Sequence, residues 1–157
     1  MGKPTHIDDK GRARMVDVGD KEISTRLARA EGWIRLSEDA FQAVVDDKVA
    51  KGSVLAVAQL AGITAAKRTP DLIPLCHPLP LTGVEVEITP EAPGRIHVQA
   101  CVRADWKTGV EMEALTAVSA ALLTIYDMVK SMDKAPVMGP IQLLEKKGGR
   151  SGHWQRS

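Results

Sequence analysis

The fold is decided by residues 81–105, which read LTGVEVEITPEAPGRIHVQACVRAD. Apolar and polar side chains alternate on both sides of the Pro93-Gly94 pair. Alternation with a period of two residues is typical of a half-buried strand, and a Pro-Gly pair marks a turn. We therefore predict an antiparallel hairpin whose strands run over residues 81–91 and 95–105.

The sequence around this hairpin predicts two further strands and three helices. Ser37 and Ser53 stand where helix N-caps are expected, and the Thr69-Pro70 pair must end the second helix. The predicted order is strand, helix, helix, strand, strand, helix, strand, over residues 26–36, 37–48, 54–68, 81–91, 95–105, 109–132 and 136–149. Paired strands with helices on one face make an α+β fold, and the ferredoxin-like antiparallel sheet is its nearest common form.

The chain has 157 residues, the size of one domain. We predict a single domain over residues 1–157, with a flexible or loosely docked arm at residues 1–23 and a flexible tail at residues 148–157. The arm is rich in Lys, Arg and Asp and has no apolar segment of the secretory type.

Composition argues against two classes of partner. The net charge of +1 lacks the basic excess of a general nucleic-acid binder, and no run of 18 apolar residues is present to span a membrane. The two cysteines, Cys76 and Cys101, form no CxxC pair. A domain of this size does not need a disulfide, so we expect a reduced, cytoplasmic protein.

The longest predicted helix has two unlike sides. One is an apolar stripe, which we expect to pack on the sheet, made of Leu115, Val118, Leu122, Ile125, Val129 and Met132. The other carries alanines and a few polar groups, among them Asp127 and Lys130, and so predicts a cover by another helix or another subunit. Asp127 and Lys130 are either an inert surface pair or a covered functional pair, and the pattern leaves both open. Glu111 is expected at or before the first turn.

Known catalytic motifs are absent from the sequence. It contains no GxGxxG, GxxxxGK[ST], HExxH or GxSxG pattern. Cys76 and His77 are adjacent, and a strand would point them to opposite faces, so they do not predict a nucleophile and its base. No metal site is expected, because a metal needs three or four ligands and the other histidines have no suitable spacing. Cys76 is best explained as a structural cysteine, whereas His77 can be a packing, acid/base or ligand-binding residue.

Long blocks of the sequence resemble one known family. These are THIDDKGRARMVDV (5–18), AAKRTPDLIPLCHPL (65–79), KTGVEMEALTAVSAALLTIYDMVK (107–130) and GPIQLLEKKGGRSG (139–152). They are similar, in order and spacing, to the MoaC family, the cyclic pyranopterin monophosphate synthases of molybdenum cofactor biosynthesis. The resemblance covers nearly the whole chain, and such blocks are far more specific than a short motif.

The resemblance implies a fold, an activity and an assembly. Members have a ferredoxin-like fold and form homohexamers, as trimers of dimers, with active sites at subunit interfaces. They convert a 3′,8-cyclo-7,8-dihydroguanosine triphosphate, made from GTP by a radical enzyme, into cyclic pyranopterin monophosphate and pyrophosphate. No cofactor is implied, and the sequence does not indicate Mg²⁺.

The resemblance also implies the site residues. The family's catalytic pair matches Asp127 and Lys130. Its substrate-binding residues match Leu75, Cys76, His77, Met112, Glu113, Glu111, Lys51, Lys67, Arg26 and Lys146. Because other lysines would crowd Lys130, we expect its pKa to be lowered, as acid/base work requires.

Two alternative functions stay in view. A non-catalytic sensor or scaffold of the same fold would bind a purine triphosphate without turnover. An RNA-binding domain of ferredoxin-like fold would need exposed aromatic residues on its sheet, and this chain has only one Phe, one Tyr and three Trp.

Overall fold

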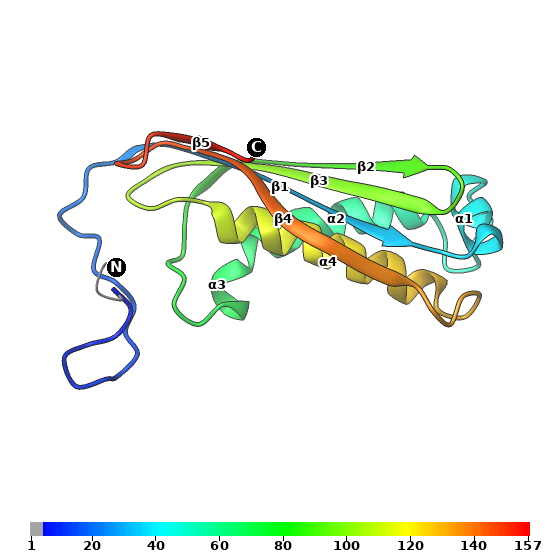
Figure 1. Ribbon diagram of the computed structural model, residues 1–157, viewed down its shortest axis with the longest axis horizontal. Helices are drawn as coiled ribbons and strands as arrows, with labels where there is room; N and C mark the ends of the chain where they lie inside the picture. Colours follow the sequence, from blue (N-terminus) through cyan, green and yellow to red (C-terminus); the bar gives the residue numbers. More distant parts are fainter. Residues whose placement is uncertain (1–4) are drawn as a thin grey trace.

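The sheet is antiparallel and five-stranded, and the main helices cover one of its faces (Figure 1). The structure, a computed structural model, describes residues 5–157; the first four residues of the predicted arm lie outside that range. In chain order the elements are β1 (Ser24–Arg35), α1 (Glu38–Val45), α2 (Val54–Lys67), α3 (Thr69–Leu72), β2 (Leu81–Glu91), β3 (Arg95–Trp106), α4 (Glu111–Val129), β4 (Val137–Lys147) and β5 (His153–Gln155).

The strand order β2-β3-β1-β4-β5 confirms the predicted α+β, ferredoxin-like arrangement. The hairpin of β2 and β3 forms in antiparallel register, with Val84 opposite Val102 and Val86 opposite Ala100. Strand β1 lies between β3 and β4, and its alternate residues enter the core as its pattern predicts. This central position of β1 explains why its core side chains are fully buried.

Small residues let the helices approach the sheet and each other closely. A Cβ built on Gly32 of β1 would lie 2.9 Å from side-chain atoms of both Leu122 and Val118 in α4. A Cβ on Gly62 of α2 would lie 3.0 Å from the carbonyl oxygen of Ala117. Helix α4 is therefore buried on two sides, by the sheet and by α2, which is the second cover that its alanines predict.

The structure corrects several details of the sequence interpretation. Met132 lies beyond the end of α4 and is 47% exposed, so it does not belong to the buried stripe. Ser37 caps α1 by accepting a hydrogen bond from the amide of Ala40, but Ser53 makes no side-chain cap bond.

The short helix α3 was not predicted. It begins at Thr69, where the Thr69 hydroxyl donates to the carbonyls of the last turn of α2.

The expected tail contains a short strand that the sequence did not predict. Strand β5 pairs with β4, and its three residues are exposed. Three residues are too few for a recognisable alternation, and backbone bonds to β4 supply the pairing.

Helix α4 is also the only helix among residues 5–157 that is long and apolar enough to cross a membrane. Half of its most apolar window is buried inside the fold.

Candidate active site

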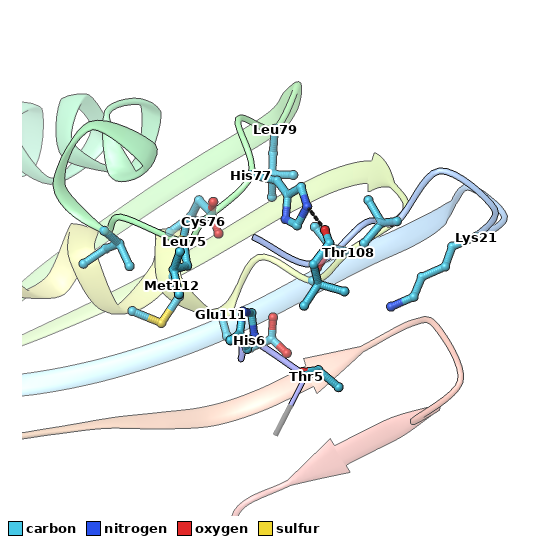
Figure 2. A pocket seen from close by; sticks show the side chains of 15 residues that line it. Thr5, His6, Lys21, Leu75, Cys76, His77, Leu79, Thr108, Glu111 and Met112 are labelled. Carbon is cyan, nitrogen blue, oxygen red and sulfur yellow. Dashed lines mark hydrogen bonds between the residues drawn. The ribbon is translucent and has the colours of Figure 1, made fainter. Parts of the chain in front are cut away.

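A cavity of about 610 Å³ lies where the start of α4, the loop after α3 and the N-terminal arm meet (Figure 2). All three elements lie at the same end of the molecule in Figure 1. Six of the predicted substrate-binding residues line this cavity, namely Leu75, Cys76, His77, Glu111, Met112 and Glu113. The structure thus brings two separate sequence blocks together.

The loop that carries Leu75, Cys76 and His77 is held at both of its sides. The amide of Cys76 donates to the carbonyl oxygen of Ile73, 3.1 Å away. The imidazole Nε2 of His77 lies 2.6 Å from the carbonyl oxygen of Val16 in the arm (Figure 2). Since a carbonyl only accepts, this His77 nitrogen carries a proton and donates it.

Two carboxylates stand at the start of α4, in different surroundings. Glu113 is only 3% exposed, and burial, aided by the nearby charge of Glu111, raises its pKa to about 7. Glu111 instead pairs with Lys146 of β4, at 3.3 Å between Oε1 and Nζ. One carboxyl can therefore hold or release a proton near neutral pH, while the other is held beside a cation.

The surroundings of Cys76 disfavour a nucleophilic thiolate. Burial, and then the nearby Glu113, raise the pKa of its thiol. A thiol with a raised pKa is mostly protonated at neutral pH, and the thiolate is the reactive form. The interpretation of Cys76 as a small neighbouring residue rather than a catalytic thiol fits this environment.

Arg26 lies next to the same corner of the fold. Its guanidinium donates to the backbone carbonyl oxygens of Trp106 and Lys107, at 3.2 and 3.1 Å. Arg26, Glu111 and Lys146 together line a small recess that borders the cavity through Gly109 and Glu111. The two predicted cations Arg26 and Lys146 are thus brought to the cavity's edge.

The predicted catalytic pair lies at the other end of α4. Lys130 Nζ is 2.6 Å from one carboxylate oxygen of Asp127, and Lys51 Nζ is 3.2 Å from the other. Asp127 follows Glu111 by sixteen residues, which a helix converts to about 24 Å. Within one chain, the Asp127–Lys130–Lys51 cluster is therefore separate from the cavity.

The expected pKa of Lys130 is wrong. The ion pair with Asp127 raises the pKa of Lys130 instead of lowering it. The hydrogen bonds from Lys130 and Lys51 in turn lower the pKa of Asp127. The expectation failed because it weighed the neighbouring lysines and left out the effect of the paired Asp127 carboxylate, which favours the charged amine.

Lys67 stands apart from both groups. It lines a different hollow of about 420 Å³, between the end of α2 and the start of β2. Leu79 lines this hollow and the main cavity alike, so the two adjoin.

The arm supplies cavity residues that were not predicted as site residues. They are Thr5, His6, Val16, Val18 and Lys21. Figure 2 shows Lys21 across the cavity from Leu75 and Met112. One indication of their importance was in the sequence, because the block 5–18 resembles the start of the family's sequences. However, the arm has no periodic pattern, so the sequence does not predict where the arm packs. No group of three or more His, Cys, Asp or Glu lies close enough to hold a metal within residues 5–157.

Comparison with known families settles the relationship. The MoaC family profile matches residues 15–149. The chain belongs to the MoaC family. This range includes all twelve predicted site residues and three of the five arm residues that line the cavity, Val16, Val18 and Lys21.

Two relatives agree with this chain over nearly their full length, and a third is a longer protein. The cyclic pyranopterin monophosphate synthase of Heliobacterium modesticaldum is 58% identical over 99% of both chains. The synthase of Thermomicrobium roseum is 54% identical over 99% of this chain and 95% of its own. A molybdenum cofactor biosynthesis bifunctional protein of Synechococcus elongatus is 57% identical over 90% of this chain, which covers 45% of that longer protein.

Proposed function

We propose that this MoaC protein is a cyclic pyranopterin monophosphate synthase, a lyase that acts on 3′,8-cyclo-7,8-dihydroguanosine triphosphate and releases pyrophosphate. The identity of more than half its residues with synthases of nearly the same length supports this function. The observation that carries it is the cavity itself, which places a buried acid, a histidine donor and a basic edge around about 610 Å³.

The complete site would be assembled from two subunits. Asp127, Lys130 and Lys51 form an exposed cluster about 24 Å from the start of their own helix. Two subunits in a closed symmetric pair can place this cluster of one chain at the cavity of the other. We therefore propose a homohexamer, arranged as a trimer of dimers, with composite sites.

The phosphate chemistry follows from these groups. A sugar hydroxyl oxygen attacks the α-phosphorus, a new P–O bond closes the cyclic phosphate, and the bond to the bridging oxygen breaks as pyrophosphate leaves. The hydroxyl proton passes to a base, for which Asp127 is a candidate because its lysine partners lower its pKa and so keep it ionised and able to accept a proton. Lysines and arginines near the leaving oxygens offset the charge that develops there.

Rebuilding the base moiety needs further proton transfers. Glu113 is the best acid in the cavity, since its pKa of about 7 leaves it partly protonated at neutral pH. Asp127 raises the pKa of Lys130, so Lys130 stays a cation that can hydrogen-bond the substrate from the other subunit. His77, through its Nε2 proton, can hydrogen-bond the substrate once it leaves Val16.

The working context follows from the same proposal. The substrate would come from a radical enzyme that acts on GTP, and the protein would work in the cytoplasm. No cofactor is proposed, and no nucleic acid or membrane is needed.

The test is direct turnover. The purified protein is incubated with GTP and the radical enzyme, and the product is detected as the oxidised fluorescent pterin together with released pyrophosphate. Formation of both supports the synthase. Tight substrate binding without product would instead indicate the sensor or scaffold.

A further inference from the structure

A hollow of about 420 Å³ lies where β1 ends and β3 and β4 begin, at the opposite end of the sheet from the candidate active site (Figure 1). Arg35 follows Arg26 by nine residues of one strand, which span about 30 Å, so the two sites are separate. We propose that this hollow binds a small aromatic carboxylate. The proposed function assigns no ligand to this region. The hollow is lined by Trp33, Arg35, Arg95, Val137, Gly139 and Pro140.

The tryptophan and the two arginines of the hollow point away from the helices. Ile34 and Ile96 are fully buried on the face of the sheet that the helices cover. Because side chains alternate along a strand, Trp33, Arg35 and Arg95 project from the opposite face. The hollow therefore lies on the face that the main helices leave uncovered (Figure 1).

A break in the strand pairing makes room beside the indole of Trp33. The pairing of β1 with β4 shifts between Gly32 and Ile34, so that Gly139 and Pro140 of β4 both stand opposite Trp33. Two residues opposite one is the pattern of a β-bulge, which bends a strand and re-aims its side chains. A Cβ built on Gly139 would have no atom within 4 Å, so the space beside this residue is open.

The charge of the hollow suits a ligand with one negative charge. Arg35 is exposed, and its side chain makes no hydrogen bond or ion pair among residues 5–157. Arg95 instead shares its charge with Glu91, whose Oε2 lies 2.6 Å from Arg95 Nη2. The two arginines and this carboxylate leave a net charge of about one positive unit. A guanidinium can bind a carboxylate through two parallel hydrogen bonds, whereas a phosphate monoester would bring nearly two negative charges.

The remaining walls of the hollow suit a flat ring. Val137 and Pro140 supply apolar surface. The Trp33 indole is held by stacking on His97, with 4.8 Å between the ring centroids, and the Arg95 guanidinium lies 5.5 Å from its centroid. Aromatic ligands pack favourably against aromatic rings and guanidinium groups. The Nε1–H of Trp33 is buried without an acceptor in the described part of the chain, and a carboxylate oxygen at this wall would offset the cost.

Titration with nicotinate, a flat heteroaromatic ring that carries one carboxylate, tests this assignment. Ligand-detected NMR on the full chain should show saturable binding with a Kd of about 1 mM, as expected for so small a ligand. Arg35→Gln should weaken binding about tenfold, since it removes a charge-assisted contact. Arg103→Gln is the matched control, because it removes an arginine that lies on the same face of the sheet and pairs with Glu85, and it should bind like wild type.

Two further ligands test the ring and the charge separately. Nicotinamide has the ring without the charge, and acetate has the charge without the ring, so each should bind at least about ten times more weakly than nicotinate. The aromatic carboxylate site is overturned by absence of saturable nicotinate binding to wild type or by equal affinities of Arg35→Gln and Arg103→Gln. Binding of nicotinamide or acetate as tight as that of nicotinate would overturn it as well. The titration involves no turnover, so its outcome does not depend on the synthase activity.

Discussion

The imidazole of His77 donates a hydrogen bond to the backbone carbonyl oxygen of Val16, 2.6 Å away and 61 residues earlier in the chain. This bond ties the proline-flanked loop after α3 to the N-terminal arm. The arm thereby becomes a wall of the candidate active site. A substrate that accepts a hydrogen bond from His77 Nε2 must replace the Val16 carbonyl oxygen as the acceptor. Substrate binding would therefore change how the arm is held.

Replacing His77 tests both roles. His77→Ala should lower kcat/KM about 10- to 100-fold, because it removes a hydrogen bond to a charged ligand. It should also speed amide hydrogen exchange around Val16, while circular dichroism stays unchanged. Cys76→Ser is the matched control, since burial raises the pKa of the Cys76 thiol and disfavours the reactive thiolate, so we expect a much smaller effect on turnover. A greater loss in Cys76→Ser than in His77→Ala would contradict this assignment.

The Asp127–Lys130 pair should matter for turnover and not for folding. Both side chains are more than half exposed, so Asp127→Asn and Lys130→Ala should fold normally. Each should reduce kcat about 100- to 10,000-fold, as expected when a general acid or base is removed. Asp46→Asn, which breaks another surface pair, with Lys48, should keep full activity. Wild-type turnover in both cluster variants would remove this pair from the mechanism.

The raised pKa of Glu113 predicts a particular dependence of stability on pH. Its pKa is about 7 in the folded protein, against an ordinary value of 4.5. The unfolded chain then releases this proton at lower pH than the folded protein, so Glu113 lowers stability progressively as pH rises from about 4.5 to about 7.

Glu113→Gln removes the ionisable group and with it the loss of folding stability between pH 4.5 and 7. Relative to wild type, the variant should become more stable over the same interval, by about 1–3 kcal/mol at the upper end. Thermal denaturation at a series of pH values measures the difference in Tm. Glu87→Gln, on the exposed face of β2, serves as the control. A Glu113→Gln difference in Tm that is constant between pH 4.5 and 7 would refute the shifted pKa.

The contact between β1 and α4 predicts a stability effect. In Gly32→Ala the new Cβ would lie 2.9 Å from Leu122 and Val118, so we expect a loss of about 1–3 kcal/mol from overpacking. Gly83→Ala places its Cβ 3.6 Å from Arg103, an ordinary contact, and should change stability by less than about 0.5 kcal/mol. Urea denaturation compares the two. Equal stability of both variants would show that α4 can move away from β1.

The sequence predicted the fold well where periodicity reports burial. The alternation in residues 81–105 placed the hairpin, and the alanines of α4 indicated a second cover, which α2 provides. Segments without a periodic pattern of apolar residues cannot be placed in this way. The position of the arm against His77, the short helix α3 and the strand β5 were therefore missed.

The site was predicted as a set of residues but not as an arrangement. Sequence blocks named both Glu113 and Asp127, yet the structure puts them at opposite ends of one helix. The direction of the Lys130 pKa was also wrong, because it depends on the carboxylate beside the amine rather than on the number of lysines. The spacing of Asp127 and Lys130 was in the sequence, whereas the hydrogen bond from Lys51 to Asp127, across 76 residues, is visible only in three dimensions.

The composite site is the central claim, and subunit mixing tests it most directly. His77→Ala and Asp127→Asn proteins, each with reduced turnover, are unfolded together in equal amounts and refolded into mixed oligomers. If His77 of one subunit works with Asp127 of another, about a quarter of the sites are intact and turnover should recover to about a quarter of the wild-type rate. If mixed oligomers form and turnover stays at the level of the separate variants, the two residues do not share a site between subunits.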